Sequence, residues 1–99
     1  MPLVLLCASS FERSLKNLDA QQQAIVARVI EALEIYYSNG CSLSKVFETE
    51  TRFFYKKLRR DFYEAGVEGR LRIVLRKDGL KCSAILAGNH DQIKKFLSQ

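Results

Sequence analysis

Residues 69–91 read GRLRIVLRKDGLKCSAILAGNHD, and this stretch decides the fold. Its first part, 70–77, alternates basic and aliphatic residues with the period of a β-strand, which sends the two kinds of side chain to opposite faces. The Asp78-Gly79 pair is a typical hairpin turn, and 80–87 is a second apolar run. The stretch therefore predicts two antiparallel strands. One face of the first strand carries three cations: Arg70, Arg72 and Arg76.

The segment before this hairpin is predicted as another strand, over 53–60, followed by a glycine-containing connection over 61–69. Alternation divides the strand into two sets of side chains, and both sets include cations. One set is Tyr55, Lys57 and Arg59, and the other is Phe54, Lys56, Leu58 and Arg60. Whichever face is open to solvent therefore carries positive charge, and the first set is the more aromatic.

The N-terminal half predicts a strand and a helix hairpin. Residues 3–7 are apolar and branched, which is typical of a strand buried on both faces. A capping box from Ser9 to Glu12 is expected to start a two-turn helix that ends near Asn17. A second, longer helix is expected from the Asp19 cap to an Asn39-Gly40 C-cap.

The segment 41–51 is predicted as a polar connector. At the other end, 90–97 is expected to form a short helix with Asn89 as its cap. Its inward contacts are predicted to be Ile93, Phe96 and Leu97.

The chain has 99 residues, with 47% hydrophobic and 27% charged side chains, five glycines and one proline. This is ordinary globular composition at the size of one domain, so we expect a single domain over 1–99. The fold class is predicted as α+β: an N-terminal strand, an antiparallel helix hairpin on a small, mostly antiparallel sheet, and a short C-terminal helix.

Positive charge is concentrated in one part of the sequence. Residues 52–81 contain ten Lys and Arg against four Asp and Glu, a net charge of +6, whereas the remaining residues have a net charge of −1. A segregated basic surface favours polyanionic partners such as nucleic acid or an acidic peptide.

Three widely spaced cysteines and one histidine provide neither a zinc site nor a disulfide framework, so we expect no metal, no cofactor and a reducing cytoplasm. The apolar run 3–8 is too short to span a membrane. It is predicted to be the first strand.

The predicted order of elements resembles that of the RelE/ParE toxin superfamily of toxin–antitoxin systems. Four segments carry the resemblance: SFERSLKNL (10–18), YKKLR (55–59), GRLRIVL (69–75), and AGNHD (87–91) followed by KFL (95–97). In RelE-like endoribonucleases, lysines of the second strand, an arginine of the third, and an arginine or histidine plus a tyrosine near the C-terminus surround the scissile phosphate.

The resemblance implies that Lys57, Arg72 and His90 are catalytic. The RNA-binding residues would be Arg59, Arg70, Arg76 and Tyr55. Tyr55 stands where members of the family frequently have another lysine, and its ring is suited to stacking on a base. The guanidinium groups can donate paired hydrogen bonds to phosphate. Lys57 can act as a proton acceptor or as a positive charge that holds the phosphate. His90 can transfer protons near neutral pH. The chain departs from the family at Phe96 or Ile93, where many active members have tyrosine.

The activity that the resemblance implies is metal-independent cleavage of mRNA, with the message held in the ribosome and the RNA 2′-OH attacking the adjacent phosphate. A cognate antitoxin is the expected protein partner. Two alternatives remain open: a ParE-like inhibitor of DNA gyrase without nuclease activity, which the missing tyrosine favours, and a catalytically silent relative that binds RNA or antitoxin.

Overall fold

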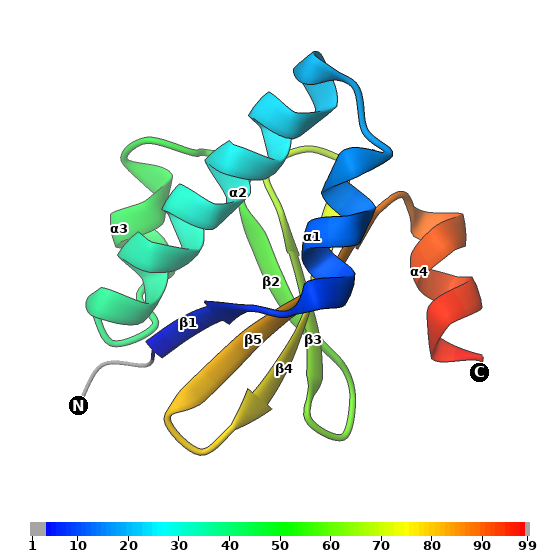
Figure 1. The fold of residues 1–99 in the computed structure, drawn as a ribbon. Helices are drawn as coiled ribbons and strands as arrows, with labels where there is room; N and C mark the ends of the chain where they lie inside the picture. The colour runs from blue at the N-terminus through cyan, green and yellow to red at the C-terminus, as the bar shows by residue number, and fades with distance from the viewer. Residues whose placement is uncertain (1–3, 99) are drawn as a thin grey trace.

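The computed structural model describes residues 4–98, and it forms one five-stranded sheet with four helices (Figure 1). The elements are β1 (Val4–Cys7), α1 (Ser9–Lys16), α2 (Ala20–Ser38), α3 (Leu43–Phe47), β2 (Phe54–Arg59), β3 (Phe62–Gly66), β4 (Arg72–Asp78), β5 (Lys81–Gly88) and α4 (His90–Leu97). The strand order is β1-β5-β4-β3-β2. Only β1 pairs in parallel, and the predicted α+β class with a mostly antiparallel sheet is confirmed.

The first strand lies at the edge of the sheet, which corrects the prediction of a strand buried on both faces. Leu6 is 44% exposed, and Cys7 is also exposed. The sequence analysis did not predict that this strand pairs in parallel with β5. Because β5 is its one neighbour in the sheet, the other edge of β1 is unpaired. Of the predicted range 3–7, Leu3 lies outside the described residues.

Serine hydroxyls of α1 attach this helix to β5, and the predicted Ser9 capping box does not form. The N-cap of α1 is Ala8, without a side-chain hydrogen bond. The pairing of β4 with β5 is irregular at Ile85, where the ladder skips one residue. The Ser10 hydroxyl donates to the Ile85 carbonyl at 2.6 Å, and the Ser14 hydroxyl accepts from the Ala87 amide at 3.0 Å. These bonds satisfy backbone groups near the bulge and fix the helix on the strand.

The second helix begins and ends as predicted. Asp19 and Gln22 form a reciprocal capping box, and Gly40 has a positive φ of 65° just after the helix. Its apolar face packs on the sheet, where Val29 and Leu33 belong to the same buried cluster as Ile73 of β4. Among the helices of residues 4–98, none is long and apolar enough to cross a membrane.

Two segments that the sequence indicated as connections contain regular structure. The connector 41–51 includes the five-residue helix α3, and the connection 61–69 includes β3. The strand β3 pairs with both β2 and β4, so the antiparallel part has four strands rather than three. A tight turn with Arg60 at φ 49° joins β2 to β3.

The two faces of the sheet have different coverings, and this decides which side chains form the site. The first two helices cover one face, over Ala65, Ile73 and Leu75. The short helix α4 lies beside the other face, where its residues share a hollow with Lys56 and Glu64. As predicted, Asn89 caps this helix and Ile93 is buried, whereas Phe96 and Leu97 are half-buried.

Candidate nucleic-acid interface

Arg72 is the centre of a polar cluster on the face that α4 borders. Its Nη1 donates to Glu64 Oε1 at 2.8 Å and lies 3.3 Å from Nδ1 of His90. The guanidinium also lies over the Phe54 ring, 5.4 Å from its centroid. The other side of this ring lies on Gly66, where a Cβ would meet Phe54 Cε1 at 2.7 Å, so a larger residue at position 66 would displace the ring. Pairing and ring contact together fix the orientation of the arginine.

Glu64 holds two cations on this face, and the sequence analysis missed it. It is the one buried charged residue within 4–98, at 2% exposure. Besides Arg72, its Oε1 lies 3.3 Å from Nζ of Lys56. Burying a carboxylate without partners costs free energy, so Glu64 can be buried here because Arg72 and Lys56 pair with it. The sequence could have indicated Glu64 through its pairing opposite Lys56, but this pairing can be predicted only if 62–66 is first assigned as a strand.

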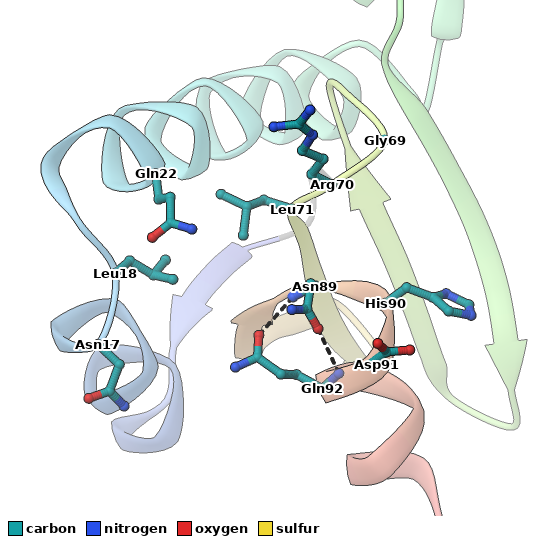
Figure 2. A pocket seen from close by; sticks show the side chains of 10 residues that line it. All are labelled: Asn17, Leu18, Gln22, Gly69, Arg70, Leu71, Asn89, His90, Asp91 and Gln92. Carbon is teal, nitrogen blue, oxygen red and sulfur yellow. Dashed lines mark hydrogen bonds between the residues drawn. The ribbon is translucent and has the colours of Figure 1, made fainter.

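The His90 ring accepts a hydrogen bond from Arg72, and this defines its tautomer. A guanidinium has donors only, so Nδ1 must carry a lone pair and the ring proton must lie on Nε2. His90 is the first residue of α4 and is exposed. Figure 2 shows the His90 ring directed away from Leu18 and Leu71.

The structure brings Arg72 and His90 together, but it places Lys57 on the opposite face of the sheet. Lys57 pairs in register with Tyr63, whereas Lys56 pairs with Glu64. Side chains of opposed residues share a face, so the lysine that accompanies Arg72 is Lys56. The prediction of one concave surface for Lys57, Arg72 and His90 is therefore wrong for Lys57.

Tyr55 lies on that opposite face as well, in an aromatic cluster below α2. Its ring stacks on Tyr63 with centroids 5.3 Å apart, and its hydroxyl accepts from the Tyr37 hydroxyl at 2.9 Å. Burial raises the pKa of Tyr55. Tyr37 also contacts the buried Cys82 at 3.1 Å, and burial raises the pKa of both side chains. This packing indicates a structural role for Tyr55.

The three other predicted RNA-binding arginines lie in different places. The Arg59 side chain donates to the carbonyl of Leu97, at the C-terminal end of α4. Arg76 pairs with Asp61 at 3.0 Å on the β2–β3 turn, which lowers the pKa of that carboxyl. Arg70 precedes β4 and lines a hollow beside His90. Arg70 thus shares a hollow with His90, and Arg59 contacts a residue that lines the hollow of Lys56 and Glu64.

Phe96 packs edge to face on Phe62, with ring centroids 6.0 Å apart. The aromatic residue near the C-terminus thus stabilises the contact between α4 and β3. Within residues 4–98, no three His, Cys, Asp or Glu side chains are grouped as a metal site would require. The three cysteines are free.

Comparison with solved structures identifies the architecture. The RelB–RelE antitoxin–toxin complex from Methanococcus jannaschii matches with a TM-score of 0.65 and 19% identity, over 92% of this chain and 96% of that one. YafQ from E. coli matches with a TM-score of 0.61 and 13% identity, over 92% and 97%. This chain has a RelE-like fold.

A third match, the RelBE2 toxin–antitoxin complex from Mycobacterium tuberculosis, gives a TM-score of 0.54 and 19% identity, over 91% of this chain and 93% of that one. No family model and no curated protein matches the sequence. The RelE-like fold is thus evident in the structure at low sequence identity. It places Arg72 on a central strand and His90 at the start of the last helix.

Proposed function

We propose that this chain is a toxin of a type II toxin–antitoxin system that cleaves mRNA held in the ribosome, without a metal ion. The observation that carries the proposal is the contact of the half-buried Arg72 with the exposed His90 on the sheet face that α4 borders. The ammonium of Lys56 lies on the same face, held by the carboxylate that also holds Arg72. The RelE-like fold, shared with RelE and YafQ toxins, supports the same conclusion.

The chemistry requires an anion clamp and a proton acceptor for the 2′-OH. A phosphate oxygen would take the Arg72 Nη1 donor, because a charged guanidinium prefers an anion to a neutral imidazole. Nδ1 of His90 is then released and can accept the proton of the attacking 2′-OH. Arg72 and Lys56 stabilise the additional charge on phosphorus, and the exposed 5′-oxygen leaves toward solvent, which protonates it.

Positioning by the ribosome fits the small number of acid–base groups at this cluster. Glu64 is buried and holds two cations, so it is not available as a proton acceptor. The cluster has two cations to hold a phosphate but one imidazole to transfer protons. The reaction rate at such a site rises most when another molecule has already oriented the substrate. We therefore assign the message in the ribosome, rather than free RNA, as the substrate.

An antitoxin is the proposed protein partner. The solved RelB–RelE, RelBE2 and DinJ–YafQ structures are toxin–antitoxin complexes. This chain has a net charge of +5, and its exposed Lys56 lies at the cluster. An acidic, amphipathic antitoxin segment would neutralise this charge and block access to Arg72.

The test is incubation of the purified protein with ribosomes and message in the presence of EDTA. We expect cleavage products with 2′,3′-cyclic phosphate ends. A known RelE toxin serves as the positive control for the ribosomes. Intact message beside a cleaving control would contradict the proposal. If cells expressing the protein still stopped growing, that result would favour the gyrase alternative.

Two adjacent lysines distinguish the faces of the sheet. Lys56→Ala should lower the single-turnover cleavage rate by about tenfold or more, because a charge-assisted contact to phosphate is lost. Lys57→Ala removes the same charge from the opposite face and should leave the rate within about threefold of the wild type. Each variant loses one positive charge, so each controls for nonspecific attraction of RNA. The reverse pattern would contradict the assignment of Lys56 to the site.

A further inference from the structure

A hollow of about 240 Å³ lies between α4 and β2, next to the Arg72 cluster. Lys56 and Leu58 of β2 line it, and so do His90, Lys94 and Leu97 of α4. Its volume is below the range of about 300–1,000 Å³ that is typical of small-ligand sites. The hollow therefore suits a compact group such as a phosphate rather than a whole nucleotide.

Lys94 brings a further positive charge to this hollow. It is exposed, and it takes part in no ion pair within the part of the chain that the structure describes. The carboxylate that lines the same hollow, Glu64, is already paired with Arg72 at 2.8 Å and with Lys56 at 3.3 Å. The acidic residue of α4, Asp91, lines a different hollow. The ammonium of Lys94 is thus available to an anion from outside the chain.

The spacing of His90 and Lys94 matches the repeat of a nucleic-acid backbone. Lys94 follows His90 by four residues on α4, so the two side chains lie on the same side of the helix. Four residues correspond to about 6 Å along the helix axis, which is comparable to the length of one nucleotide in an extended strand. A strand whose scissile phosphate lies at Arg72 and His90 would therefore bring a neighbouring phosphate to Lys94.

The electrostatics of the helix end does not explain why Lys94 differs from its neighbour. Lys94 and Lys95 both lie in the last turn of α4, where the helix dipole stabilises cations. Lys95, however, lines another hollow, which it shares with Leu86 of β5. The two lysines thus border different sides of the helix, and it is Lys94 that shares a hollow with His90.

We propose that Lys94 binds the backbone phosphate next to the scissile one, and that the hollow between α4 and β2 is a second phosphate subsite. The inference rests on the proposed function, because the Arg72–His90 contact defines which phosphate is the scissile one. An ammonium on a flexible chain holds a phosphate without fixing its orientation, whereas the planar guanidinium of Arg72 orients the reacting group. Contact with a phosphate that does not react strengthens substrate and transition-state binding alike, so Lys94 acts on affinity.

Binding of a short RNA that cannot be cleaved tests this assignment. The probe is a fluorescent trinucleotide with 2′-O-methyl groups, which remove the nucleophile, and it has a scissile and a flanking linkage. In each of two further probes, one of these linkages is replaced by a neutral methylphosphonate. We expect replacement of the flanking linkage to weaken binding to the wild type by about fivefold. The same replacement should weaken binding to Lys94→Ala by less than about twofold, because the partner of that phosphate is already absent.

Lys95→Ala is the matched control, because it removes the same charge from the same turn of α4. Both lysines are exposed, so neither substitution removes a core contact. The control should lose affinity for each replaced probe as the wild type does. Lys56→Ala should instead become insensitive to replacement of the other linkage, which the proposed mechanism assigns as scissile. Fluorescence anisotropy at constant salt measures all of these affinities.

The outcomes separate this inference from the proposed function. The subsite would be overturned if Lys94→Ala remained as sensitive as the wild type to both replacements, if Lys95→Ala lost the same sensitivity, or if no probe bound. The nuclease activity is tested separately, by cleavage of message on ribosomes in EDTA. Linkage-specific coupling to Lys94 without this cleavage would support the subsite and contradict the nuclease. Cleavage without such coupling would support the nuclease and overturn the subsite.

Discussion

Arg72→Lys is expected to lower the single-turnover rate of message cleavage by about 100-fold to 1000-fold, the loss that follows removal of one preorganised donor to a developing oxyanion. Lysine keeps the positive charge beside Glu64, so the buried carboxylate retains a cationic partner. What is lost is the planar fork, which contacts Glu64 and His90 in the structure and would exchange the His90 contact for a phosphate oxygen in the proposed complex. The substitution therefore tests geometry rather than charge.

The control for this variant is Arg28→Lys. Arg28 is likewise paired with a carboxylate, donating to Glu50 at 2.8 and 2.6 Å, but it lies on α2. Cleavage by the control should stay within about twofold, because exposed ion pairs contribute little. Circular dichroism would confirm that both variants are folded. An Arg72→Lys protein that is folded and cleaves within threefold of the wild type would remove Arg72 from the site.

The features that sequence reasoning predicted well are local ones. The alternation in 70–77, the Asp78-Gly79 turn, and the caps at Asp19 and Asn89 each depend on residues within a few positions of one another. Such signals do not require knowledge of the distant contacts. The exception is Ser9, whose hydroxyl makes no cap although the Ser–Glu spacing is correct. In this case the backbone enters α1 directly from a strand paired with β5.

The features that sequence reasoning missed depend on long-range pairing. The sequence FYEAG of β3 begins with two residues that favour strands, but its glutamate, alanine and glycine do not, so its strand character is weak. It is a strand because β2 and β4 pair with it on both sides. Without β3 there is no place for Glu64 beside Arg72.

The choice between Lys56 and Lys57 has the same origin. Alternation divides the second strand into two sets of side chains but does not say which set the helices cover. In the structure, α2 packs over Tyr55 through Tyr37, and this turns Lys56 toward Arg72. A shift of one residue thus separates the predicted catalytic lysine from the one that shares the site.

Leu33→Ala is expected to reduce the free energy of unfolding by about 2–5 kcal/mol, a large share of the about 5–15 kcal/mol typical of a small domain. Leu33 is 0% exposed and packs in the cluster that attaches α2 to the sheet, so its removal leaves a cavity. Urea denaturation followed by circular dichroism measures the change.

Leu6→Ala is the matched control, because it deletes the same atoms at the 44% exposed edge strand. It should cost less than about 1 kcal/mol, since little apolar surface is lost there and the surroundings can adjust. This comparison also tests the position of β1. If Leu6→Ala were as destabilising as Leu33→Ala, the first strand would have to be buried within the sheet, as the apolar run alone had indicated, and the edge assignment would be wrong.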